Sequence, residues 1–417
     1  MADFERSTPD ASRAALLSLR NRRARELGAP FAVVERAGRG QCVVASREIA
    51  AGAIILRERP LFAQQYAPPW PAGGTDTNLA CAACLAPAAD LATCFAHLAG
   101  SAVVDLPHAA AVGCGPGAPC ARACGVSYCS AACAARDAES HEAVCASAPT
   151  PPPTTTTGLE GLEYFRLGAR VAAAAHAATR RLRDGAPAAA DDAAVLAALG
   201  GLSAVPFDET LDAGGGATAA IASAAAALRR ALCDAEWLSD ERFGLLLGQL
   251  RLNCQTVRVE SPLLGYFESL GALDAEAADA ALAALAEPIE HLRRAPHVLR
   301  ATVEASARCV DDDGAPEEDE ALEASAMFPS TEGIALFALQ SAFNHSCEPN
   351  CLMTTSNASA FAEVIVVADR ALAPGEELCF DYLVGEQPSA EKRAALEGQY
   401  RFRCDCAGCS NDPTVTK

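Results

Sequence analysis

The stretch that decides the fold is NHSCEPN at 344–350, followed by GEELCFDY at 375–382 and RFRCDCAGC at 401–409. The apolar run ALFALQSAF precedes the first of these segments. A β-branched run and a Pro-Gly turn at 374–375 precede the second. Such runs between turns are typical of short strands. Residues 331–388 are therefore predicted to form strands and turns, with three closely spaced cysteines after them.

A second strand-rich segment lies near the N-terminus, at 31–66. Its apolar or β-branched runs are Val33-Val34, Gln41–Ala45 and Ala53–Leu56, and the turns between them contain Gly38, Gly40 and Gly52. Residues 158–310 instead carry long Ala/Leu runs with few Gly or Pro, which predicts helices, with Asp274 as one N-cap. The expected fold class is α+β, with the β-rich parts separated in sequence.

Composition narrows the class of partner. The 417 residues include 53 acidic and 33 basic side chains, giving a net charge of −20 at pH 7. A surface this acidic argues against direct nucleic-acid binding, which needs a basic footprint, and it suits a basic protein partner. No apolar run reaches the roughly 18 residues of a membrane span, and the N-terminus has no signal-peptide core, so we expect an intracellular protein of the nucleus or cytoplasm.

The 19 cysteines are then expected to include metal ligands rather than to form a disulfide framework. Residues 81–145 contain four short-loop pairs: Cys81 and Cys84, Cys120 and Cys124, Cys129 and Cys133, His141 and Cys145. A closed zinc site takes four N or S ligands, so eight ligands predict two ions. The long gap after Cys84 also holds four alternatives to Cys120, namely Cys94, His97, His108 and Cys114.

A third zinc site is predicted at the C-terminal end. Cys404, Cys406 and Cys409 lie within six residues and lack a fourth ligand locally. Cys347, within NHSCEPN, is the natural candidate to complete an all-thiolate site. Such a site would fasten the C-terminal segment over the body of the domain.

These motifs, in this order and with Gly38-Arg39-Gly40 near the N-terminus, resemble a SET domain. YCSAAC and the late His-x3-Cys resemble a MYND zinc finger inserted into it. The combination, from about 31 to 409, is similar to the SMYD family of protein-lysine methyltransferases, most of all to its fifth member. The resemblance divides the chain into an N-terminal extension (1–30), a first SET part (31–80), a MYND finger (81–145), a Pro/Thr linker (146–157), a helical insert with an acidic loop (158–330), the C-terminal SET core (331–388) and a post-SET zinc segment (389–417).

The resemblance also implies roles for individual residues. In the MYND family ligand pairs alternate, which implies Cys81, Cys84, Cys129 and Cys133 on one ion and Cys120, Cys124, His141 and Cys145 on the other. The implied cofactor is S-adenosylmethionine, bound by Gly38, Arg39, Gly40, Asn253, Asn344, His345 and Phe402. Tyr382 matches the catalytic tyrosine, and Tyr400 matches the aromatic wall of the substrate lysine channel. His345 is expected to bind cofactor rather than act as a general base.

Two functions remain open from sequence. The first is methylation of a lysine in a basic protein, a histone tail or a ribosomal protein. The second is a catalytically silent adaptor that binds partner peptides through the MYND finger. The acidic run DDDGAPEEDE at 311–320 reads either as a solvated loop or as a docking surface for a basic substrate.

Overall fold

The structure is a computed structural model that describes residues 9–66, 79–112, 114–122, 124–145, 161–186, 192–207, 216–233, 235–295, 297–298, 327–355, 361–383 and 390–410. The Pro/Thr linker and the acidic run at 311–320 lie outside the described residues. The described chain mixes helices with short strands, which confirms the α+β class. None of its helices combines the length and the apolar character that crossing a membrane requires.

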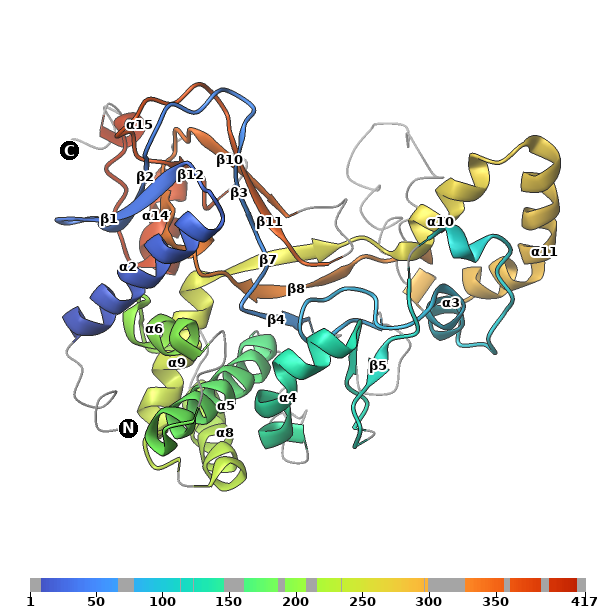
Figure 1. Cartoon of the computed structure of the whole chain (residues 1–417), viewed down its shortest axis with the longest axis horizontal. Coiled ribbons are helices and arrows are strands. Elements are labelled where there is room, and N and C mark those ends of the chain that lie inside the picture. The colour runs from blue at the N-terminus through green and yellow to red at the C-terminus, as the bar shows by residue number, and fades with distance from the viewer. Residues whose placement is uncertain are drawn as a thin grey trace.

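Strands from the two ends of the chain build the β-rich half of the molecule (Figure 1). An antiparallel hairpin is formed by β1 (Phe31–Arg36) and β2 (Gly40–Ala45). The first three-stranded sheet has the order β10 (Cys351–Thr355), β11 (Val364–Ala368), β3 (Ile54–Glu58). The inner face of this sheet contacts a buried cluster that includes Phe343 and Phe380, so the two sequence regions share one core.

A second antiparallel sheet reaches toward the far side of the molecule. Its order is β4 (Phe62–Gln65), β8 (Thr331–Leu336), β7 (Cys254–Val259). The prediction of helix throughout 158–310 is wrong at β7. Its CQTVRV sequence contains β-branched Thr and Val residues, and it pairs along its whole length with β8. Pairing with a distant partner overrides the helical pattern on either side.

The Ala/Leu-rich region forms two separate groups of helices (Figure 1). One group contains α5 (Leu162–Asp184), α6 (Asp192–Gly201), α8 (Gly216–Leu232) and α9 (Asp240–Asn253). The other contains α10 (Pro262–Gly271) and α11 (Ala275–Arg293), which join α3 (Leu91–Ala99) around a core of their own. The predicted N-cap is confirmed, because the Asp274 carboxylate accepts the Ala277 N–H at 2.9 Å.

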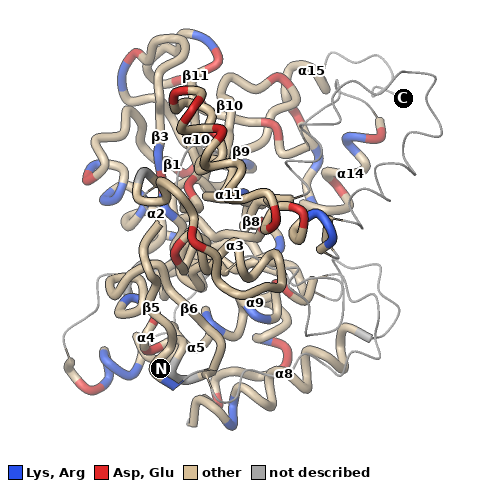
Figure 2. The backbone as a smooth tube through the Cα atoms, turned by 90° about the vertical axis from the view of Figure 1, so that its right-hand side faces the viewer, with Lys and Arg blue, Asp and Glu red and all other residues tan. Residues whose placement is uncertain are grey.

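The remaining elements are short, apart from the first helix. The cysteine-rich unit contains β5 (Ala118–Pro119), β6 (Ser127–Tyr128) and α4 (Ala131–Cys145), and the chain begins with α2 (Pro9–Glu26), which lies against α6. The C-terminal part adds β9 (Asn344–His345), β12 (Cys379–Phe380), α14 (Ala390–Tyr400) and α15 (Ala407–Ser410). Lys and Arg positions are scattered over these elements rather than collected on one face (Figure 2).

Gly248 of α9 lies where another backbone segment approaches closely, and this gives a first prediction. A Cβ there would lie 1.6 Å from the Val205 carbonyl oxygen. Gly248→Ala should therefore lower the free energy of unfolding by about 1–3 kcal/mol, although alanine is the better helix former. The matched control is Gly244→Ala on the same helix, where the nearest atom lies at 3.6 Å. Urea unfolding followed by circular dichroism measures both, and equal stability of the two variants would contradict the prediction.

Candidate active site

The site forms where two segments far apart in sequence run side by side. β9 pairs with β12 in parallel, with Asn344 opposite Cys379 and His345 opposite Phe380. Asn350, at the end of NHSCEPN, locks this pairing. Its side-chain amide donates to the Glu377 carbonyl at 2.8 Å, and its side-chain oxygen accepts the Cys379 N–H at 2.9 Å. The pairing brings the polar turn and the FDY segment into one structure.

Asn344 sits at the centre of a polar network. Its Nδ2 donates to the Glu377 carboxylate at 3.0 Å and lies 3.3 Å from the Gln41 carbonyl oxygen. Burial alone would raise the pKa of Glu377, but the hydrogen bond from Asn344 and the charges of Arg39 and Arg36 lower it. Glu377 therefore stays ionised and fixes the orientation of the Asn344 amide.

Tyr382 is held from both ends. Its hydroxyl donates to the Phe343 carbonyl oxygen at 2.7 Å, and its backbone N–H donates to Nδ1 of His345 at 3.1 Å. Burial raises the pKa of the Tyr382 phenol above its ordinary value, with Tyr400 and Cys379 contributing. The phenol is therefore neutral at physiological pH, and its hydroxyl has a fixed direction.

His345 is neutral for the same reason, although its pKa moves in the opposite direction. Burial lowers its pKa to about 4, although Asp381 lies close enough to oppose the shift. Since Nδ1 accepts from Tyr382, the proton is assigned to Nε2, which lies 3.2 Å from the Cys347 sulfur. The ring thus links the tyrosine to a cysteine of the C-terminal cluster, consistent with a binding rather than a general-base role.

Aromatic rings from the C-terminal segment close one side of the site. The ring centroids of Tyr382 and Tyr400 lie 4.9 Å apart, and Phe402 lies 6.0 Å from His345 and 6.3 Å from Tyr382. Such separations are typical of aromatic contacts in cores and binding sites. They make a wall of flat, largely apolar faces.

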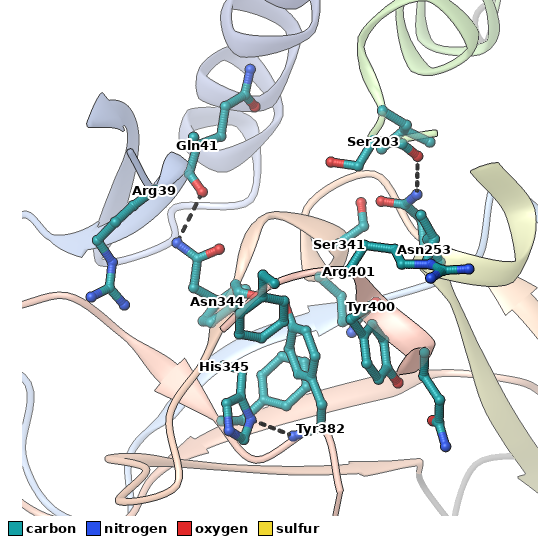
Figure 3. A pocket seen from close by; sticks show the side chains of 18 of the residues that line it. Arg39, Gln41, Ser203, Asn253, Ser341, Asn344, His345, Tyr382, Tyr400 and Arg401 are labelled. Atoms are coloured by element: carbon teal, nitrogen blue, oxygen red, sulfur yellow. Dashed lines mark hydrogen bonds between the residues drawn. The ribbon is translucent and has the colours of Figure 1, made fainter. Parts of the chain in front are cut away.

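All nine residues predicted to bind cofactor or substrate line a single cavity of about 1040 Å³, part of which is drawn in Figure 3. They are Gly38, Arg39, Gly40, Asn253, Asn344, His345, Tyr382, Tyr400 and Phe402. The structure brings them together from five segments of the chain. Which of them bind a cofactor stays a prediction.

The side chains of Arg39 and Asn253 also bind parts of the chain outside the predicted site. Arg39 extends away from Asn344 in Figure 3 and pairs with the Asp405 carboxylate at 3.1 Å and with Glu377 at 3.6 Å. Asn253 donates to the Ser203 carbonyl oxygen at 3.0 Å and to that of Gln249 at 2.7 Å. Arg39 thus ties the Gly38–Gly40 loop to the C-terminal segment, and Asn253 ties α9 to the loop after α6.

Two buried charged residues near the site were missed from sequence. Glu58 of β3 accepts hydrogen bonds from the backbone N–H groups of Ala338, Leu339 and Gln340, at 2.9–3.1 Å. Arg20 of α2 lines the cavity and is 3% exposed. The position of each residue relative to its apolar neighbours could have indicated that it is buried. Glu58 falls on a core-facing position of its strand, and Arg20 shares a helix face with Leu16, four residues earlier.

The cysteine-rich unit assembles two groups of ligand atoms. Cys81, Cys84, Cys129 and Cys133 form one group, and Cys120, Cys124, His141 and Cys145 form the other. In the first group the sulfur atoms of Cys84, Cys129 and Cys133 are separated by 3.6–3.8 Å, and that of Cys81 lies within 4.8 Å of each. Four thiolates about 2.3 Å from a zinc ion lie about 3.8 Å from one another, so the geometry fits a tetrahedral ion. A disulfide would need a separation near 2.05 Å.

The alternatives to Cys120 lie elsewhere. Cys120 is 3.8 Å from Cys145 and 3.1 Å from the His141 ring nitrogen, measured at their ligand atoms. Cys94 is buried on α3 and points its thiol at the Ala89 carbonyl oxygen. Cys114 contacts the same apolar core as α3. Both cysteines are part of the apolar core around α3, α10 and α11, which is called the α3 lobe below.

The third group joins the NHSCEPN turn to the C-terminal segment. It contains Cys347, Cys404, Cys406 and Cys409. The Cys347 sulfur lies 3.9 Å from that of Cys404 and 3.7 Å from that of Cys409, again the spacing of a zinc tetrahedron. Tyr400 and Phe402 contact this group, so the cluster fixes the aromatic wall.

The arrangement defines the class of the protein: an α+β chain whose cavity lies beside the parallel pair β9 and β12 and a cysteine cluster. The SET domain family model matches residues 40–383, and the chain belongs to the SET domain family. It is 35% identical over 99 residues to Protein-lysine N-trimethyltransferase SMYD5 of Mus musculus, and 38% identical over 77 residues to Histone-lysine N-methyltransferase SMYD3 of the same species. It is 32% identical over 121 residues to N-lysine methyltransferase SMYD2-B of Danio rerio.

These matches are partial. They cover 22%, 18% and 29% of this chain and 23%, 17% and 25% of the respective relatives. The chain thus spans a quarter or less of the length of these curated relatives. The resemblance to SMYD proteins predicted from sequence is confirmed, with SMYD5 among them.

The cluster geometry generates a prediction about metal content. The purified protein should contain three zinc ions, and Cys409→Ser should contain two, because an all-thiolate tetrahedron loses a ligand. Cofactor affinity should also fall in this variant, since Phe402 depends on the cluster for its position. Cys233→Ser is the control, because Cys233 is exposed and lies outside the three groups. Elemental analysis that finds two ions in the parent protein would refute the C-terminal site.

Proposed function

We propose that this protein is an S-adenosylmethionine-dependent protein-lysine N-methyltransferase. The observation that carries the proposal is the convergence of five separate segments on one cavity, with a neutral tyrosine hydroxyl fixed at its wall. Membership of the SET domain family and the names of the relatives support the same reaction class. When bound, the cofactor supplies a methyl group on a sulfonium for direct transfer to an amine.

The cavity residues fit such a cofactor. Gly38 and Gly40 have positive φ angles of 77° and 69°, and a Cβ on either would meet nothing within 4 Å among the described atoms. Backbone at this loop is therefore open to close approach by a ligand such as S-adenosylmethionine. Phe402 offers a ring face suited to stacking on adenine, and Asn344 offers a fixed amide.

Tyr382 is best suited to orient the reacting groups. Its proton is committed to the Phe343 carbonyl, so the hydroxyl oxygen keeps its remaining lone pairs for the substrate side. Because burial raises its pKa, the phenol does not serve as a base near neutral pH. Holding donor and acceptor in line in a site shielded from water accounts for catalysis without a covalent enzyme intermediate.

The charges around the cavity favour the reactive form of a lysine. Among the described lining residues the carboxylates are Glu35, Asp381 and Asp405, and the arginines are Arg13, Arg20, Arg36, Arg39, Arg251, Arg401 and Arg403. Several of these arginines are paired, yet the excess of positive charge disfavours an ammonium ion. The neutral amine, which has the lone pair needed for attack, is favoured.

For the substrate we propose a basic protein, either a histone tail or a ribosomal protein, methylated in the nucleus or the cytoplasm. The net charge of −20 supports long-range attraction of such a protein. The cysteine-rich unit is proposed to bind partner peptides in addition. A silent adaptor would need only that unit, and the assembled cavity favours the enzyme.

Removing one hydroxyl separates catalysis from binding. Tyr382→Phe should lower turnover at least about 100-fold while changing cofactor affinity less than threefold, because the hydroxyl acts on the reacting groups. Tyr266→Phe is the matched control. It also removes a buried tyrosine hydroxyl, one bound to the Pro107 carbonyl in the α3 lobe. Transfer of labelled methyl groups to protein in a cell extract and calorimetry with the cofactor measure the two effects. Full activity of Tyr382→Phe would contradict the assignment.

The pH dependence follows from the same groups. Burial sets the pKa of His345 to about 4 and raises that of Tyr382, so neither titrates between pH 7 and 8.5. The substrate amine, with a free pKa of about 10.4, is mostly protonated in this range. Activity at limiting substrate should therefore rise about tenfold from pH 7 to pH 8. Initial rates across this range test it, and a plateau beginning at pH 7 would show that another group or step controls the rate.

A further inference from the structure

Arg20 comes from a helix that the SET family match does not include. α2 spans Pro9–Glu26, whereas the match begins at residue 40. Arg20 nevertheless lies in the interior. Its Nε donates to the Ala338 carbonyl oxygen at 2.8 Å, its Nη2 to the Ser341 hydroxyl at 2.8 Å, and its Nη1 to the Gln41 side-chain oxygen at 2.5 Å.

Glu58 binds the same turn as Arg20, the turn at Ala338–Gln340, from its other side. That carboxylate binds the backbone N–H groups of Ala338, Leu339 and Gln340, while Arg20 binds the Ala338 carbonyl. Both charged side chains are buried, and the negative charge of Glu58 partly opposes the lowering of the Arg20 pKa by burial. An arginine suits this place because its planar group directs several donors at once, which a lysine ammonium does not.

The gripped turn leads directly into the reacting part of the cavity. Ser341 also donates to the Phe337 carbonyl oxygen, and two residues later the Phe343 carbonyl accepts the Tyr382 hydroxyl. Arg20 reaches the opposite wall as well, through Gln41, whose backbone carbonyl lies against the Asn344 amide. One side chain thus connects the segment that orients Tyr382 with the strand that follows the Gly38–Gly40 loop.

We propose that Arg20 is a positioning residue for the proposed methyl transfer, and that it acts by fixing the Ala338–Phe343 segment and hence the Tyr382 hydroxyl. The N-terminal helix is therefore part of the catalytic unit in this protein. This inference rests on the proposed function for its kinetic test. The hydrogen-bond geometry provides a second test that does not depend on activity.

The test compares Arg20→Lys and Arg20→Met with Arg22→Met in the full-length protein. Arg22 is the control because it lies on the same helix, exposed and paired with Glu26. Arg20→Lys should lower turnover per bound cofactor at least tenfold and change cofactor affinity less than threefold. In a Tyr382→Phe background the same change should lower turnover less than threefold, because the group it positions is already gone. If Arg20→Met does not fold, Arg20→Lys alone decides.

Hydrogen exchange supplies the second measurement. Amides of Ala338–Gln340 should exchange faster in Arg20→Lys than in the parent, while those of α3 and α10 remain unchanged. Unchanged turnover per bound cofactor in Arg20→Lys, or effects that multiply in the Tyr382→Phe background, would overturn the positioning role. If the parent transfers no methyl group to any protein, the proposed function fails instead. In that case the exchange experiment still tests the inference. Unchanged amide exchange at Ala338–Gln340 in Arg20→Lys would overturn it.

Discussion

The Glu58 carboxylate is the contact on which the site depends. It accepts the N–H groups of three consecutive residues, Ala338 to Gln340, in a place with almost no access to water. Burial raises its pKa, and the hydrogen bonds oppose that change. Removing one partner from such a buried ionic set typically costs about 3–5 kcal/mol, because the remaining charge is left uncompensated. The turn before NHSCEPN therefore has little freedom.

From that fixed turn the constraints pass outward through hydrogen bonds and the C-terminal cysteine cluster. Phe343 positions the Tyr382 hydroxyl, and His345 connects Tyr382 to Cys347. The chain has few aromatic residues, so large apolar anchors are scarce. The cysteine clusters would compensate when they hold zinc, because metal binding free energy orders segments that bury little apolar surface. The aromatic wall of the cavity rests on the C-terminal cluster for this reason.

Electrostatics act differently at long and short range in this protein. The whole chain is strongly acidic, which suits encounter with a basic partner over distances comparable to the Debye length. The charged residues that line the cavity are mainly arginines, which suits a neutral amine at the point of reaction. In the proposed reaction a basic protein would be attracted as a whole, while its acceptor lysine would be favoured in the deprotonated form.

The sequence by itself predicted the α+β class and the short-loop ligand pairs, and its resemblance to a known family supplied the grouping of those pairs and nine of the residues that line the cavity. Short-range spacing carries the ligand pairs, whereas the roles proposed for Asn344 and Tyr382 come from the resemblance. The tertiary structure alone decided that Arg39 pairs with Asp405, that CQTVRV is a strand, and that Arg20 and Glu58 grip one turn. Each of these depends on a partner tens to hundreds of residues away. Local propensity cannot encode such partners, because pairing energy arises only when the chain has folded.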